Sequence, residues 1–117
     1  MIGRKNRFHG YGSLKRAYQH GQTARGSLLS LRYVDRQAAK PYRVAVVVSK
    51  KVSKSAVVRN QIRRRVYEVV RLADDVPPRT DLVFTVFSEQ VAELPVDTLR
   101  ANVDQLLKKI TTPRSGD

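Results

Sequence analysis

The residues best suited to chemistry are grouped in one run, residues 57–65, which holds four arginines, an asparagine and a glutamine but no acid. Arginine presents a planar fork of N–H donors that matches the oxygens of a phosphate. Three lysines, Lys50, Lys51 and Lys54, come just before the run. Cations this close repel one another unless a polyanion neutralises them. The run therefore predicts a surface that binds nucleic-acid phosphates, although a solvated helix face is the plain alternative.

The charge of the whole chain is concentrated in the part that contains this run. Residues 1–73 hold 18 Lys and Arg against two acids, whereas residues 74–117 hold five against eight acids. The net charge of +13 therefore comes from the first two-thirds of the chain. A small domain with this excess favours a polyanionic partner, and the last third is expected to support the fold.

Several other kinds of site are not supported by the residues present. The chain has no cysteine, and its two histidines, His9 and His20, have no acid near them in the sequence, so no metal site is predicted. The Ser-Lys-Lys-Val-Ser-Lys segment at residues 49–54 lacks the glycines of a phosphate-binding loop. No protein active site is predicted, and no cofactor is expected to bind to the protein directly.

The length of 117 residues suits a single domain, and the cytoplasm is its expected location by default. No apolar run approaches the roughly 20 residues of a membrane span, and the basic N-terminus is not followed by the apolar segment of a secretory signal. One RNA-binding domain over residues 1–117 is expected, with a core over about residues 8–110. Residues 1–7 would form a basic arm and residues 111–117 a frayed tail.

Periodicity predicts an α+β sandwich with the element order α-β-β-α-β-α, in which helices cover a small mixed sheet. Helices are expected over residues 13–20, 56–73 and 95–110. Strands are expected over residues 27–34, 43–49 and 81–87. The polar residues 35–41 suggest a hairpin-like connection, and the β-branched run at residues 43–49 suggests a central strand buried on both faces.

The helix predicted over residues 56–73 has a core face and a polar face. At 100° per residue, one apolar stripe contains Val58, Ile62, Val66, Val69 and Val70. The opposite face contains Asn60, Arg64, Tyr67 and Arg71, and Arg59 and Arg63 flank it. Phe8, Phe84 and Phe87 are expected in the core.

Four tyrosines alternate with basic residues in the first third of the chain: Tyr11, Tyr18, Tyr33 and Tyr42. Such rings can stack on unpaired bases of single-stranded RNA. Packing in the core explains each of these tyrosines equally well, so neither base stacking nor core packing is favoured.

Residues 44–68 resemble the bacterial ribonuclease P protein component. That family combines a hydrophobic strand, a Ser-Lys-Lys-Val loop and an Ala-Val-x-Arg-Asn-x-Ile-Lys/Arg-Arg helix, with a Glu a few residues on. The chain retains Ser49, Lys50, Lys51, Val52, Lys54, Ala56, Val57, Arg59, Asn60, Ile62, Arg63, Arg64 and Glu68. The resemblance covers about residues 4–110.

The resemblance implies a left-handed βαβ crossover and a role as the protein subunit of ribonuclease P. Such a subunit would bind a catalytic RNA that uses Mg²⁺ to cut 5′ leaders from precursor tRNA. It is expected to be monomeric without RNA and to bind neither DNA nor membrane. The implied contacts to the catalytic RNA are Lys50, Lys51, Lys54, Arg59, Asn60, Arg63 and Arg64, with Arg65 added as a neighbour. The implied contacts to the single-stranded leader are Leu14, Arg16, Tyr18 and Tyr33.

Three positions depart from the family pattern. Gln61 stands where an arginine is usual, and Arg65 is expected to compensate for it. Leu14 replaces an aromatic residue, and Ser53 replaces a frequent glycine. The alternative function is a general RNA-binding protein, such as a ribosomal protein or an RNA chaperone. A DNA-binding helix-turn-helix protein is less well supported, because a strand and a lysine loop precede the basic helix.

Overall fold

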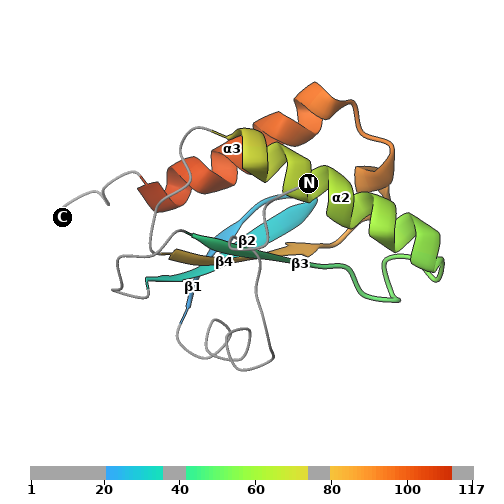
Figure 1. The fold of residues 1–117 in the computed structure, drawn as a ribbon, viewed down its shortest axis with the longest axis horizontal. Helices are drawn as coiled ribbons and strands as arrows, with labels where there is room; N and C mark the ends of the chain where they lie inside the picture. The colour runs from blue at the N-terminus through green and yellow to red at the C-terminus, as the bar shows by residue number, and fades with distance from the viewer. Residues whose placement is uncertain (1–20, 36–41, 74–79, 112–117) are drawn as a thin grey trace.

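The computed structural model describes residues 21–35, 42–73 and 80–111 (Figure 1). Its elements, in chain order, are β1 (Gln22–Arg25), β2 (Leu29–Asp35), β3 (Arg43–Val47), α2 (Ala56–Leu72), β4 (Thr80–Val86), the 3-10 helix η2 (Glu89–Ala92) and α3 (Val96–Thr111). The strands and helices predicted within these residues are confirmed. The helix predicted over residues 13–20 lies outside the described residues, as do Phe8, His9, Tyr11 and His20.

The four described strands form one mixed sheet in the order β1-β2-β4-β3. Strand β4 runs antiparallel to β2 and parallel to β3. Helix α2 therefore lies in a crossover between two neighbouring parallel strands, as the resemblance implied, while the left hand of that crossover stays a prediction. Two expectations are wrong: β3 lies at an edge of the described sheet, and β2 and β3 are separated by β4 rather than paired as a hairpin.

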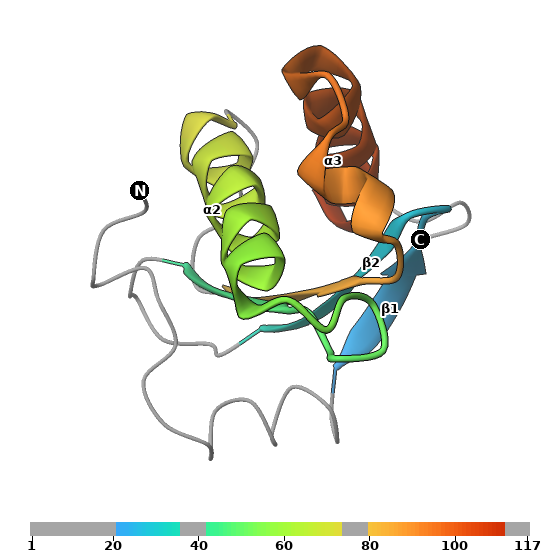
Figure 2. The same cartoon turned by 90° about the vertical axis from the view of Figure 1, so that its right-hand side faces the viewer.

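Helices α2 and α3 lie side by side over one face of the sheet (Figure 2). Strand alternation selects the residues that meet them. Leu31 of β2 and Phe84 of β4 are cross-strand partners on this face, and both are fully buried. Val44 and Val46 of β3 continue the same face. The core therefore lies between the sheet and the two helices.

Strand β4 takes the central position that was predicted for residues 43–49. Its residues are buried on both faces, since Leu82, Val83 and Phe84 are all fully buried. In β3, by contrast, only alternate residues are buried. Arg43 of β3 forms a bidentate ion pair with the buried Asp81 of β4, with Nε–Oδ1 and Nη2–Oδ2 distances of 2.9 and 2.8 Å. This hydrogen-bonded pair ties the edge strand to the centre and raises the pKa of Arg43.

Packing, more than intrinsic propensity, holds the valine-rich helix α2. Ser55 caps its N-terminus by accepting a hydrogen bond from the Val58 N–H. Four members of the predicted stripe, from Ile62 onward, are buried, and Val58 is partly buried. Tyr67 was expected on the polar face, but it is also buried and belongs to the same hydrophobic core cluster as the stripe.

The remaining elements extend the core at one end of the sheet. The apolar stripe of α3 is buried at Leu99, Val103, Leu106 and Leu107. The strand β1 and the helix η2 were not predicted, because each is only four residues long and carries a mainly polar sequence. Within the described part of the chain, no helix has both the length and the apolar character needed to cross a membrane.

Candidate RNA-binding surface

The surface begins at the loop that enters α2, residues 49–55. The carbonyl of Ser49 accepts hydrogen bonds from the N–H groups of Val52 and Ser53, at 3.0 and 3.4 Å, which closes a tight turn. Ser53 is buried, whereas Lys50, Lys51 and Lys54 are exposed. The loop, called here the entry loop (Figure 2), therefore presents three ammonium groups beside the N-terminus of a helix, where backbone N–H groups also favour anions.

The polar face of α2 continues this positive surface along the first half of the helix. Asn60, Gln61 and Arg64 are exposed, and Arg63 donates a hydrogen bond to Asn60 Oδ1. The first turn of the helix contains no acid. Cations that are exposed and lack acidic neighbours are available to phosphate oxygens.

The only acid in α2, Glu68, lies toward its C-terminal end and pairs with Arg71. The Arg71 guanidinium donates two hydrogen bonds to the Glu68 carboxylate, at 3.2 and 2.9 Å. These bonds lower the pKa of Glu68 to about 2. Arg71 is thus engaged within the helix, which confines the unneutralised part of α2 to its first half.

Two of the predicted RNA-binding arginines bind backbone carbonyls of the protein instead of pointing into solvent. Arg59 Nη1 donates to the Ser53 carbonyl at 2.8 Å. Arg65 donates through Nη1 to the Val91 carbonyl at 2.5 Å and through Nη2 to the Leu94 carbonyl. Arg65 therefore fastens η2 and the segment after it to α2, while its expected compensation for Gln61 in RNA binding stays a prediction.

Gln61, the position where the family has an arginine, lies beside η2. It lines a shallow pocket together with Glu89, Gln90 and Glu93. An arginine at this position would have carboxylates close by to pair with. Gln61 therefore replaces the usual arginine at a position next to two glutamates of the protein, whereas the rest of the polar face of α2 is basic.

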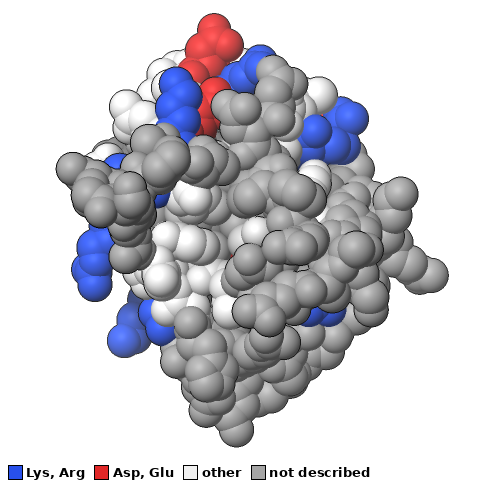
Figure 3. Space-filling model, turned by 90° about the vertical axis from the view of Figure 1, so that its left-hand side faces the viewer, with Lys and Arg blue, Asp and Glu red and all other residues white. Residues whose placement is uncertain are grey.

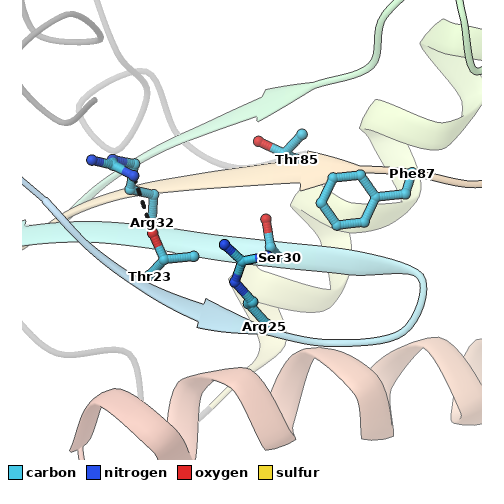
Figure 4. A pocket seen from close by; sticks show the side chains of 6 residues that line it. All are labelled: Thr23, Arg25, Ser30, Arg32, Thr85 and Phe87. Atoms are coloured by element: carbon cyan, nitrogen blue, oxygen red, sulfur yellow. Dashed lines mark hydrogen bonds between the residues drawn. The ribbon is translucent and has the colours of Figure 1, made fainter. Parts of the chain in front are cut away.

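A second polar and cationic site lies on the sheet face opposite α2 and α3 (Figure 4). It is a pocket of about 180 Å³ lined by Thr23, Arg25, Ser30, Arg32, Thr85 and Phe87. The lining side chains come from β1, β2 and β4, together with Phe87 just after β4. Those on the strands occupy positions that alternate with the core residues. In the sequence, Ser30 and Arg32 alternate with the apolar Leu29, Leu31 and Tyr33, which agrees with their place on this face.

Phe87 is the aromatic residue of this pocket, and its placement corrects the prediction that it lies in the core. Its side chain is 55% exposed, and its N–H donates to the Leu28 carbonyl at 2.8 Å, which fixes the backbone there. At the end of the pocket away from Phe87, Arg32 Nη1 donates to Thr23 Oγ1 at 3.1 Å (Figure 4). An exposed ring that shares a pocket with guanidinium groups can stack a base while they bind its phosphates.

The residues predicted to contact the leader are not brought together in the described structure. Tyr33 lies on the helix-covered face, where its hydroxyl donates to Gln22 Oε1 at 3.0 Å, so it does not line the pocket. Leu14, Arg16 and Tyr18 lie outside the described residues. Their roles stay predictions, while the pocket supplies candidates on β1 and β4 that sequence reasoning missed.

The basic character extends beyond α2. Figure 3 shows the end of the molecule away from the entry loop, where Lys and Arg side chains still outnumber Asp and Glu among the residues described.

Among residues 21–35, 42–73 and 80–111, no three His, Cys, Asp or Glu side chains gather in a way that could hold a metal ion.

A four-stranded mixed sheet, two covering helices and a cationic surface define a small basic α+β protein of the RNA-binding class. Residues 2–111 match the family model described as Ribonuclease P. The chain is 34% identical over 96 residues to the ribonuclease P protein component of Caldanaerobacter subterraneus, covering 81% of this chain and 80% of that protein. It is 33% identical over 118 residues to the component from Chloroflexus aggregans, covering 96% and 84%.

Solved structures agree with the fold. The Staphylococcus aureus RNase P protein superimposes with a TM-score of 0.77 at 18% identity, covering 90% of this chain and 94% of that one. The protein from Thermotoga maritima gives 0.71 at 21% identity, covering 82% and 89%. The chain belongs to the ribonuclease P protein component family, whose members take part in tRNA processing together with RNA.

Proposed function

We propose that this chain is the protein subunit of ribonuclease P, and that it binds a catalytic RNA and the 5′ leader of precursor tRNA to promote 5′-end maturation. The observation that carries the proposal is the unneutralised surface formed by the entry loop and the first half of α2. Lys50, Lys51, Lys54 and Arg64 are exposed there, with no acid in the first turn of the helix. Family membership supports a catalytic RNA as the polyanion that binds them.

In this proposal the protein contributes binding and not bond cleavage. Cations along α2 would neutralise phosphates of the catalytic RNA and release their counterions. Cleavage of the phosphodiester would be carried out by the RNA with its Mg²⁺ ions. The protein would lower the Mg²⁺ concentration that cleavage requires, because its own charges screen RNA phosphates that otherwise repel one another.

The pocket on the opposite sheet face would bind the single-stranded leader. Phe87 offers an exposed ring for base stacking, and Arg25 and Arg32, which both lie to one side of the ring, offer charge for the neighbouring phosphates. The hydroxyls of Ser30 and Thr85 add hydrogen-bonding groups within the same pocket. Stacking with charge is how proteins bind single strands without strict sequence preference, which suits leaders of varied sequence.

The test is reconstitution of precursor-tRNA cleavage with a ribonuclease P catalytic RNA at limiting Mg²⁺. We expect the protein to increase the cleavage rate over RNA alone, and Arg64→Ala to reduce that gain. Arg100→Ala is the matched control, since Arg100 is an exposed arginine on α3. No gain from the wild-type protein would refute the proposal. Equal binding of precursor and mature tRNA, with the catalytic RNA present, would favour a general RNA-binding protein.

A further inference from the structure

The entry loop owes its shape to one buried residue and a small set of hydrogen bonds. Ser53 is only 6% exposed, and its hydroxyl accepts a hydrogen bond from the Ser55 N–H at 3.2 Å. Its own N–H donates to the Ser49 carbonyl. Ser53 is buried in this way, whereas the neighbouring Lys51 and Lys54 are exposed. The orientation of Ser53 therefore determines how the loop presents its charges.

The Ser53 carbonyl is bound by Arg59 from one turn inside α2. The distance from Arg59 Nη1 to that oxygen is 2.8 Å, and the contact is partly buried. The Arg59 N–H also donates to the Ser55 carbonyl, at 3.0 Å, so the backbone and the side chain of this residue both hold the loop. We call the Arg59–Ser53 side-chain contact the clasp. A guanidinium carries five donors, so the clasp leaves others for further partners.

A cation at this position needs such a partner. A positive charge in the first turns of a helix is opposed by the positive end of the helix dipole. Three loop lysines nearby add like-charge repulsion. The carbonyl of Ser53 compensates Arg59 locally, before any RNA is bound.

We infer that Arg59 is a positioning residue, whose clasp holds the entry loop in the conformation that presents Lys50, Lys51 and Lys54 to RNA. The inference rests on the proposed function and deepens it. Ordering a seven-residue loop at the moment of binding would cost affinity, and a loop that is ordered beforehand avoids that cost. Arg59 thus contributes to RNA binding largely through the lysines, beyond any phosphate contact of its own.

The first experiment uses the free protein and measures amide hydrogen exchange in the loop. In Arg59→Gln, the amides of Val52 and Ser53 are expected to exchange about five- to tenfold faster, the factor expected from losing one hydrogen bond. Arg63→Gln is the matched control, because Arg63 lies one turn further on and bonds Asn60 instead of the loop. Circular dichroism and Tm identify any variant that has unfolded. Arg59→Lys is the second variant, and it should restore part of the protection.

The second experiment measures affinity for a ribonuclease P catalytic RNA as a function of salt. Removing one phosphate contact lowers the slope of log affinity against log salt by about 0.7–0.9. Arg63→Gln should lower it by about that amount, and Arg59→Gln by roughly twice that or more. In a protein that already carries Lys50→Ala and Lys51→Ala, adding Arg59→Gln should weaken the affinity for RNA by less than about a further twofold. Adding Arg63→Gln to that protein should weaken the affinity by the same factor as in the wild type.

The outcomes separate the inference from the function on which it rests. Unchanged exchange at Val52 and Ser53 in Arg59→Gln, or a loss fully multiplicative with that of the lysines, would overturn the positioning role while leaving RNA binding intact. If the lysine variant bound the catalytic RNA as tightly as the wild type, the proposed docking role of the loop would fail, and the inference with it. The exchange result distinguishes these cases, because it needs no RNA.

Discussion

Replacing each of two neighbouring arginines of α2 should change a different property: Arg65 should affect the stability of the fold, and Arg64 should affect RNA binding. Arg65 donates to two backbone carbonyls, those of Val91 and Leu94, and its contacts are partly buried. Hydrogen bonds from a charged group contribute about 1.5–3 kcal/mol each, and water can replace part of that at a partly buried site. We expect Arg65→Gln to lower the free energy of unfolding by about 2–4 kcal/mol. For a chain of 117 residues, this corresponds to a fall in Tm of about 8–16 °C.

Arg64 provides the comparison within the same turn of the helix. Its side chain is exposed, so Arg64→Gln should change the unfolding free energy by less than about 0.5 kcal/mol. It should instead lower the slope of log RNA affinity against log salt by about 0.7–0.9, the amount expected for the loss of one phosphate contact. Thermal and urea unfolding measure the first quantity, and fluorescence anisotropy with a catalytic RNA over a range of salt concentrations measures the second. A normal Tm for Arg65→Gln, together with a reduced salt slope, would refute the inward role of Arg65.

Three further predictions concern the pocket, a surface ion pair and a turn. Phe87→Ala should weaken binding of a single-stranded RNA oligonucleotide by about five- to 150-fold, the loss of one base stack, with little change in Tm; equal affinity would show that the ring does not stack. The pKa of Glu68 is lowered to about 2 by its hydrogen bonds with Arg71, so the pair stabilises the fold above about pH 4.5 and this contribution is lost as the pH falls toward 2. The Tm difference between wild type and Glu68→Gln should therefore shrink over that range, and a constant difference would contradict it. Gly26→Ala would place a Cβ 2.7 Å from the Leu29 carbonyl oxygen, so we expect a loss of about 1–3 kcal/mol in urea unfolding, and a variant as stable as the wild type would mean that the turn relaxes freely.

Much of this protein is determined locally by its sequence. The 3.6-residue period of α2 and α3, the alternation of β2 and the concentration of cations before residue 74 all depend on residues close together in the chain. Their predicted bounds agree with the observed elements to within one or two residues. The basic motif at residues 49–64 was also sufficient to indicate the family, because it combines residue types and spacing that a structural periodicity alone does not require.

The order of the strands was decided only by tertiary structure. The β-branched composition of residues 43–49 is compatible with any buried strand, so it could not distinguish a central position from an edge. That choice depends on β4, which pairs with β2 on one side and β3 on the other although both precede it by many residues. The short strand β1 likewise exists because β2 offers it a partner, since four mainly polar residues have too little pattern of their own.

The same limit applies to single side chains at the margins of an amphipathic pattern. Arg65 lies beside the apolar stripe of α2 and Tyr67 lies on the opposite face, so sequence predicts that both are exposed unless another part of the chain covers them. Val91 of η2 and Leu94, just after η2, supply carbonyls for Arg65, and Tyr67 is buried in the core cluster. Phe87 shows the converse, because it falls just beyond the end of β4, on the face away from α2 and α3. Sequence thus determined which residues have side chains that could bind RNA, and the packing of distant elements determined which of those side chains are exposed.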